Sequence, residues 1–461
     1  MLQKTYVRYI AAALLFACIF LYYIVSTTHR NQTLYSSSKD KTVLFGGERV
    51  KFSRFAGVET LRREKKQELV DEILKVLAQK GMPADIFTDN VFEAVNIAIT
   101  LNNAFQDENE NRDDLKKLWD NSPLTGWDAD KKKTDAVAEI LQRYERKRMT
   151  VRGMLEQPKT VFYYLFIRDK WQVHIDTEAS QYIADYALLE EYAVAKALLK
   201  GDIPAAIEAV AYVFRLAQLA DDLKVVGVCC DAATTRMRFL EVLQRIILDP
   251  KMDKTHLTFL RGMLTEQLDN WKPEHLTWFG DRASGISLYH RIMLSGPNEA
   301  LESFELDKLQ QRGIYNTFPK TFLKNHALDE AFYLLSMQKL IDAGKERFYK
   351  RIDTINEVQN SMLKLQDTPI EPVVACLMLD NVDKFMRIFA QDLSRMETAV
   401  LALQLALEAN ADKQQKLIQS SLDPFTGEPY QVQRQDGFID VSAQNRRKPF
   451  RVKSMTVKTE E

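Results

Sequence analysis

The sequence predicts a mainly α-helical protein, an irregular array of helical hairpins with an N-terminal transmembrane helix and a small C-terminal β-hairpin. Three observations predict this organisation. Residues 9–25 are all apolar or aromatic, residues 185–222 carry two successive amphipathic helical patterns, and residues 420–443 switch to a turn-rich segment of alternating polarity. Helical patterns fill most of the rest of the body.

The composition supports a folded body. Of the 461 residues, 46 % are apolar and 28 % are charged, so the chain can bury a sizeable core. The 63 Lys and Arg residues nearly cancel the 64 Asp and Glu residues. Because no strong positive field results, we expect no nucleic-acid partner.

The N-terminal segment YIAAALLFACIFLYYIV, residues 9–25, is at the short end of the length needed to cross about 30 Å of hydrocarbon. A cleaved signal peptide would need a small-x-small site, but the segment ends in bulky residues. A lipoprotein signal at Cys18 would need a polar sequence after the cysteine. We therefore predict an uncleaved signal anchor within residues 1–26, which begin with a cytoplasmic stub.

The orientation follows from the short flank that ends at Arg8, although the positive charges on the two sides of the segment are nearly equal in number. We expect a single-pass protein of the bacterial inner membrane, held in the membrane through residues 9–25, with most of the chain on the periplasmic side.

The body then divides by composition. Residues 27–60 form a juxtamembrane linker with a short extended piece at 42–45. Residues 61–134 form an N-terminal helical subdomain that ends in a charged loop, and residues 135–419 form the main helical body.

The clearest helical hairpin covers residues 185–222. Gly201 ends its first helix, Asp202 is a suitable N-cap, and Pro204 falls in the first turn of its second helix. The unit is locally tetratricopeptide-like, but no 34-residue period repeats elsewhere. We predict further helices over 230–247, 257–271, 328–364 and 373–410. The adjacent acids at 190–191 and 221–222 diverge on a helix, so we expect them on solvated faces or at caps.

The cysteines and histidines show no metal-binding pattern. The cysteines are Cys18, Cys229, Cys230 and Cys376, and none has the spacing of a zinc site. A disulfide between Cys376 and one of the adjacent pair stays open, with buried free thiols preferred. No H-E-x-x-H motif occurs. We therefore predict no metal site and no cofactor.

The best local cluster for a pocket is WKPEHLTW, where Trp271, His275 and Trp278 could share one face if the segment were helical. Pro273 argues for a turn instead, and burial of the tryptophans at a helix junction explains the same residues.

The following stretch, WFGDRASG, is expected to be a loop that offers Asp281 and Arg282, and His290 follows it as a candidate anion contact. No segment brings together a nucleophile, a base and an oxyanion donor, so no catalytic residue is assigned.

The C-terminal segment has the chemistry of a hairpin. Asp423 and Pro424 suit the first two positions of a type I turn, and Gly427 gives the backbone after the turn more freedom. Asp436-Gly437 is a two-residue hairpin signal. The expected strand pairs are Arg434 with Ile439, Val432 with Val441, and Tyr430 with Ala443. A lone hairpin is marginal in water, so this one should dock onto the helical body or onto another protein. Residues 444–461 are basic and expected to be a disordered tail.

The run DPFTGEPYQVQRQDGFIDVS resembles the C-terminal β segment of type II secretion pseudopilins. Anchor, helical body and final DPF-x-G-x-P hairpin together resemble a group of uncharacterised bacterial membrane-anchored proteins of planctomycete type. The chain lacks the Gly-Phe cleavage site and the glutamate of a prepilin, and Ser442 is not followed by the acidic calcium ligands of the pseudopilin tail.

These features predict a membrane-anchored, non-enzymatic helical scaffold of the bacterial envelope, whose hairpins bind a protein partner that the sequence does not identify. One alternative is a component of a secretion or pilus-like assembly, which the tail resemblance implies. Another is an envelope hydrolase with a site near residues 271–290.

Overall fold

The computed structural model describes residues 42–45, 48–51, 64, 96–105, 131–160, 178–222, 224–301, 303–366, 368, 371–443 and 449–455. The expected anchor at 9–25 and most of the segments 27–60 and 61–134 lie outside the described residues. Within the linker, β1 (Thr42–Phe45) pairs antiparallel with β2 (Glu48–Lys51), which confirms the short extended piece.

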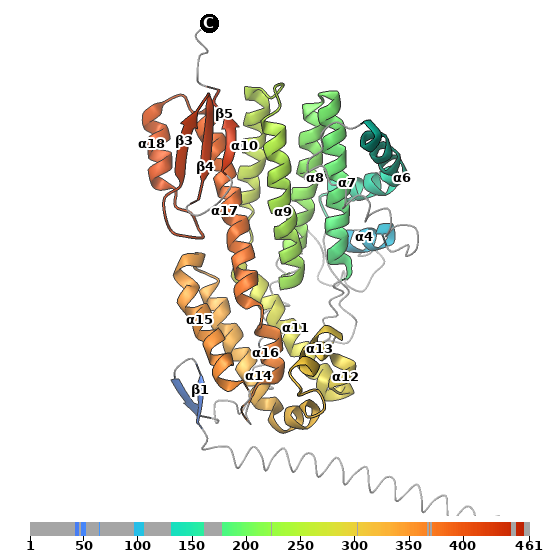
Figure 1. Cartoon of the computed structure of the whole chain (residues 1–461), viewed down its shortest axis with the longest axis vertical. Helices are drawn as coiled ribbons and strands as arrows, with labels where there is room; N and C mark the ends of the chain where they lie inside the picture. Colours follow the sequence, from blue (N-terminus) through green and yellow to red (C-terminus); the bar gives the residue numbers. More distant parts are fainter. Residues whose placement is uncertain are drawn as a thin grey trace, which may run out of the picture.

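The described body is mainly helical and carries a small antiparallel sheet at its C-terminal end (Figure 1). Its upper helices are α4 (Ile97–Phe105), α6 (Lys131–Glu156), α7 (Glu178–Lys200), α8 (Ile203–Asp221), α9 (Val226–Ile247) and α10 (Lys254–Asp269). Its lower helices are α11 (Glu274–Ser295), α12 (Pro297–Ala300), α13 (Ser303–Gln311), α14 (Phe318–Ala343), α15 (Phe348–Leu365) and α16 (Val373–Leu379). The long helix α17 (Val382–Leu407) joins the two groups, and α18 (Ala411–Ser420) leads into the sheet.

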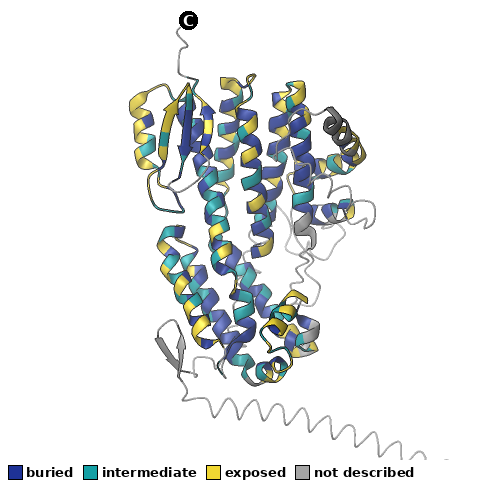
Figure 2. Cartoon of the chain, in the orientation of Figure 1, coloured by how far each residue is buried: buried dark blue, intermediate teal, exposed yellow. Residues whose placement is uncertain are grey.

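Apolar side chains form two separate cores. The first core lies among α4, α6–α10, the C-terminal half of α17 and the sheet. The second core lies among α11–α16 and the N-terminal half of α17, with Val226 and Cys230 from the start of α9. Dark-blue buried faces run through both groups of helices and along α17 (Figure 2). Helix α17 thus contributes Met386 and Ala390 to the second core and Met396 and Leu403 to the first.

The helical hairpin at 185–222 is confirmed. Gly201 ends α7 with a φ of 68°, a left-handed conformation that favours glycine. The Asp202 carboxylate then accepts a hydrogen bond of 3.1 Å from the amide of Ala205 and caps α8. The turn forms because its local chemistry ends one helix and begins the next.

Several predicted boundaries are wrong. The helix predicted over 328–364 is two helices, α14 and α15, separated by the turn 344–347, and the one predicted over 373–410 is broken between α16 and α17. Pro273 does not make a turn inside the WKPEHLTW cluster, because it is the N-cap of α11. The WFGDRASG segment is therefore helical, since all of it lies within α11.

The glycines of that segment let α11 pack closely against its neighbours, and they do not form a flexible loop. A Cβ on Gly280 would lie 1.5 Å from the backbone carbonyl oxygen of Lys224, and a Cβ on Gly285 would lie 2.3 Å from the ring of Tyr333. Only glycine lets α11 approach these neighbours so closely.

The acids at 190–191 are also not solvated. Glu190 accepts hydrogen bonds of 2.8 and 2.6 Å from Arg152 and one of 3.1 Å from Arg148, while Glu191 accepts one of 2.7 Å from Arg238. Both carboxylates are buried. The two side chains diverge as expected, but each carboxylate is hydrogen-bonded to arginine side chains from another helix.

The C-terminal strands are β3 (Gln431–Gln435), β4 (Phe438–Ser442) and β5 (Phe450–Lys453). The register of β3 and β4 pairs Arg434 with Ile439 and Val432 with Val441, as predicted. Asp436 and Gly437 have φ values of 51° and 77°, which a two-residue hairpin turn requires. The hairpin prediction is therefore confirmed.

The third strand corrects the expectation of a disordered tail, because Phe450–Lys453 pairs with β4. Ile439, Val441 and Val452 are buried in the first core, so the sheet docks onto its own helical body. The side chain of Gln244, on α9, exchanges hydrogen bonds with the backbone of Arg451 and covers the outer edge of β5.

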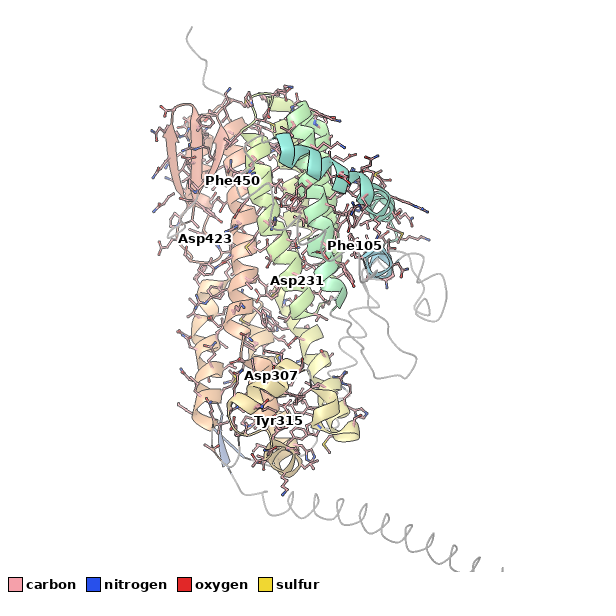
Figure 3. The ribbon with its side chains drawn as sticks, turned by 45° about the vertical axis from the view of Figure 1, so that its right-hand side comes forward. Phe105, Asp231, Asp307, Tyr315, Asp423 and Phe450 are labelled. Carbon is pink, nitrogen blue, oxygen red and sulfur yellow. The ribbon has the colours of Figure 1, made fainter. Side chains whose placement is uncertain are left out.

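The turn that precedes the sheet, residues 422–427, lies between the two cores and is called the tail turn below. Figure 3 shows Asp423 between the sheet, marked by Phe450, and the helices of the second core. The Asp423 carboxylate is fully buried and accepts hydrogen bonds from Ser394 of α17 and from the Thr426 amide and hydroxyl. Phe425 stacks on Phe348 of α15 at 4.7 Å. The tail turn therefore connects α17 to α15.

Replacement of Gly280 by alanine tests the close approach of α11. The added Cβ collides with backbone that cannot rotate away, so Gly280→Ala should destabilise the fold by about 1–3 kcal/mol or more. The control is Gly262→Ala on α10, where no atom lies within 4 Å of the added Cβ. That variant should be neutral or more stable by roughly 0.5–1 kcal/mol. Thermal melting of the two variants compares them, and equal melting temperatures would contradict this packing.

Candidate functional site

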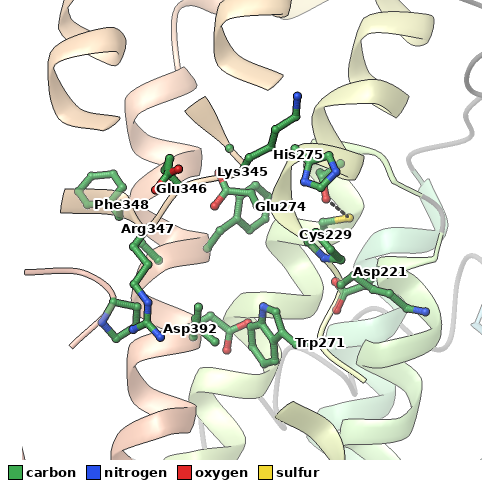
Figure 4. Close-up of a pocket in the computed structure, with 18 of the residues that line it drawn as sticks. Asp221, Cys229, Trp271, Glu274, His275, Lys345, Glu346, Arg347, Phe348 and Asp392 are labelled. Carbon is green, nitrogen blue, oxygen red and sulfur yellow. Dashed lines mark hydrogen bonds between the residues drawn. The ribbon is translucent and has the colours of Figure 1, made fainter. Parts of the chain in front are cut away.

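A cavity of about 420 Å³ lies where the two cores meet (Figure 4). We call it the interlobe cavity. Residues from α8, α9, α11, α15 and α17 line it, together with residues 271–273, the turn 344–347 and Pro424 of the tail turn. Because these elements come from both cores, the cavity depends on how the two groups of helices are held together.

Arg236 of α9 forms the central ion bridge. Its Nε and Nη2 donate to Asp392 Oδ2 on α17 at 2.8 and 2.6 Å, and its Nη1 donates to Asp221 Oδ2 at the end of α8 at 2.6 Å. The guanidinium also lies over the ring of Trp271 at 4.8 Å. Arg236 and Asp392 are buried, so one side chain links α8, α9 and α17.

A second buried ion pair crosses from α11 to α15. Glu274 accepts a hydrogen bond of 2.5 Å from Arg351 Nη2 and one of 3.0 Å from Trp278 Nε1. Arg351 is 4 % exposed and also lies over the ring of Phe348 at 5.5 Å. Among the described residues, its Nε and Nη1 atoms have no hydrogen-bond partner, although both are shielded from solvent.

Burial shifts the acids of the cavity toward their neutral forms. Burial raises the pKa of Asp392 to about 7, against the opposing effect of Arg236. The same cause raises the pKa values of Asp221 and Glu274, again against arginine partners. One guanidinium faces two carboxyls in the Arg236 bridge, so the second negative charge is poorly compensated.

Cys229 lines the cavity but is not poised as a nucleophile. Its thiol accepts a long contact of 3.7 Å from the Thr277 hydroxyl, the dashed line in Figure 4. Burial raises its pKa far above the ordinary value, so the thiol is protonated at neutral pH. Cys229, Cys230 and Cys376 are all free thiols, as predicted; the first two are buried and Cys376 is partly exposed.

The cavity gathers only part of the cluster predicted from the sequence. Trp271 and His275 line it. Trp278 is buried in the second core against Phe389, Arg282 is buried and donates to Gln338 at 2.9 Å, and His290 is exposed. Asp281 is half-buried on α11, where its backbone carbonyl accepts a hydrogen bond from Tyr333.

Sequence reasoning missed Arg236, Arg351 and Asp392. A signal was present, because each is a charged residue on a helix face that is otherwise apolar. Their pairing was not readable, since Arg236 and Asp392 are 156 residues apart. Of the predicted tail residues, only Pro424 reaches the cavity lining, while Gly427 packs its backbone against the ring of Tyr349.

Comparison with protein-family models, with curated proteins and with solved structures finds no match to this chain. Among the described residues, no group of three His, Cys, Asp or Glu side chains could hold a metal ion. One described helix, α8, is long and apolar enough to cross a membrane, and it packs between α7 and α9 in the first core. Its burial accounts for that composition.

Asp392→Asn should change how stability depends on pH. Arg236, Asp221 and Arg395 face the carboxyl, whose pKa in the fold lies above the ordinary value. The fold therefore favours the neutral form, and this contribution to stability is complete below about pH 4 and is lost as the pH rises toward 7. The melting temperature of the wild type should fall between about pH 4 and pH 7, and that of the asparagine variant should fall less. Identical pH profiles would show that Asp392 keeps its charge in the fold.

Proposed function

We propose that this chain is a membrane-anchored, non-enzymatic interaction protein of the bacterial envelope. It captures a protein partner at the mouth of the interlobe cavity. The observation that carries this proposal is the cavity itself, which lies between two helical cores. We take its mouth to be the turn 344–347, where lining side chains are exposed. The proposal places the anchor at residues 9–25, in the inner membrane, with the body on the periplasmic side.

The ionisable groups deep in the cavity favour binding over catalysis. Glu274 is paired with Arg351, and Asp221 and Asp392 share Arg236. These pairs hold helices together, and the Cys229 thiol is protonated. The hydrolase alternative relied on both His275 and His290, but only His275 lines the cavity.

The mouth has the character of a contact surface. Lys345 and Glu346 line the cavity and are both more than half exposed. Phe348 and Phe389 also line the cavity. A polar rim around an aromatic interior is the usual anatomy of a protein interface.

The tail supports this reading more than it supports the secretion-assembly alternative. That alternative needs the hairpin to be a docking element for another subunit. Here the apolar face of the sheet is buried against α17, and the tail turn forms part of the cavity wall. The tail therefore braces the site.

Site-specific photo-crosslinking in intact membranes tests the proposal. A photoreactive residue at Glu346, whose side chain is 59 % exposed, should capture one discrete protein. The control position is Arg143 on α6, which is 55 % exposed and distant from the cavity lining. It should capture none. Equal capture at both positions, or none at Glu346 in folded and inserted protein, would reject the mouth as the contact surface.

A further inference from the structure

The first step concerns the unused donors of Arg351. A buried arginine with two donor nitrogens unpaired costs free energy, and such groups in native proteins call for a partner. Glu274 supplies a partner for Nη2 only. Since Arg351 lines the cavity, an oxyanion that enters the cavity and reaches the guanidinium would remove this cost.

The second step concerns the charge of the lining. The cationic side chains there are Arg236, Lys272, Lys345, Arg347 and Arg351. The carboxyl groups are Asp221, Glu274, Glu346 and Asp392. Lys272, Lys345 and Arg347 also pair with Asp222, Asp342 and Glu397 outside the lining. Arg351 pairs with Glu274 through Nη2 alone, so its remaining donors are the ones that an entering carboxylate can use.

The third step concerns the apolar part of the lining. Trp271, Phe348 and Phe389 contribute aromatic surface beside the charged groups. A ligand that fits this lining carries its anionic group on an apolar body. A peptide that ends in an apolar residue has both features, and capture of a terminal carboxylate is an established mode of peptide recognition.

We propose that the interlobe cavity binds the C-terminal carboxylate of a partner chain whose last side chain is apolar or aromatic. Arg351 receives the carboxylate, and the aromatic residues receive the last side chain. Lys345 at the mouth attracts the chain end electrostatically. The inference rests on the proposed function and names the part of the partner that enters the cavity.

Calorimetric titration of the full chain in detergent tests the inference with the dipeptide N-acetyl-Leu-Phe. The free acid should bind at least about tenfold more tightly than its C-terminal amide, because only the acid offers an oxyanion to Arg351. Arg351→Lys should abolish this difference. It keeps a cation for Glu274 but lacks the planar fork.

A second variant tests the inference even if Arg351→Lys fails to fold. Lys345 is 54 % exposed, so Lys345→Glu cannot disturb a core, and it should weaken binding of the acid in a salt-dependent manner. The matched control is Arg143→Glu, at a site of 55 % exposure outside the cavity lining, which should leave binding unchanged.

Equal binding of acid and amide, or no binding to folded wild type, would overturn the inference. Binding that neither Arg351→Lys nor Lys345→Glu alters would also overturn it. Phenylacetate bound as tightly as the peptide would assign the cavity to a free organic acid instead of a chain end. Partner capture at Glu346 without peptide binding would leave the proposed function standing and reject only this inference.

Discussion

The ion bridge of Arg236 is the interaction on which the arrangement of the body depends. It ties the end of α8 to α9 and to the middle of α17, at the level where the first core gives way to the second. At this level the ion pairs of Arg236 lie beside apolar side chains such as Trp271 and Phe389. The bridge leaves two acids sharing one guanidinium, and burial, with a smaller contribution from the neighbouring Asp221, raises the pKa of Asp392.

The Arg236 bridge holds α17, and α17 contributes side chains to both cores. Its 26 residues span about 39 Å, so one rigid element contributes side chains to both cores. The sheet packs on its C-terminal half and the tail turn bonds to Ser394 near its middle. The Glu274–Arg351 pair then joins α11 to α15 on the far wall of the cavity. Elements of both cores therefore line the cavity.

The features that the sequence predicted correctly are those determined by neighbouring residues. Gly201-Asp202 ends and restarts a helix, and Asp436-Gly437 sets a strand register, whatever the rest of the chain does. The errors involve distant partners. Pro273 precedes a helix, α11, instead of forming a turn. Strand β5 forms because it can pair with the edge of β4. Glu190 is buried because Arg148 and Arg152 of α6 pair with it. Only part of the cavity lining was predicted, for the same reason. Trp271 and His275 are local, whereas Arg236 and Asp392 meet only after folding.

A mutant cycle on the Arg236 bridge tests its central role most directly. Arg236→Met leaves two buried carboxyls without their cation, which at pH 8 should cost about 3–5 kcal/mol. Removing one of those carboxyls as well, in Arg236→Met with Asp392→Leu, should restore part of the lost melting temperature. Asp392→Leu alone keeps Arg236 paired with Asp221 and should cost less than Arg236→Met. A double variant whose loss equals the sum of the two single losses would contradict the bridge as the interaction that holds α9 to α17.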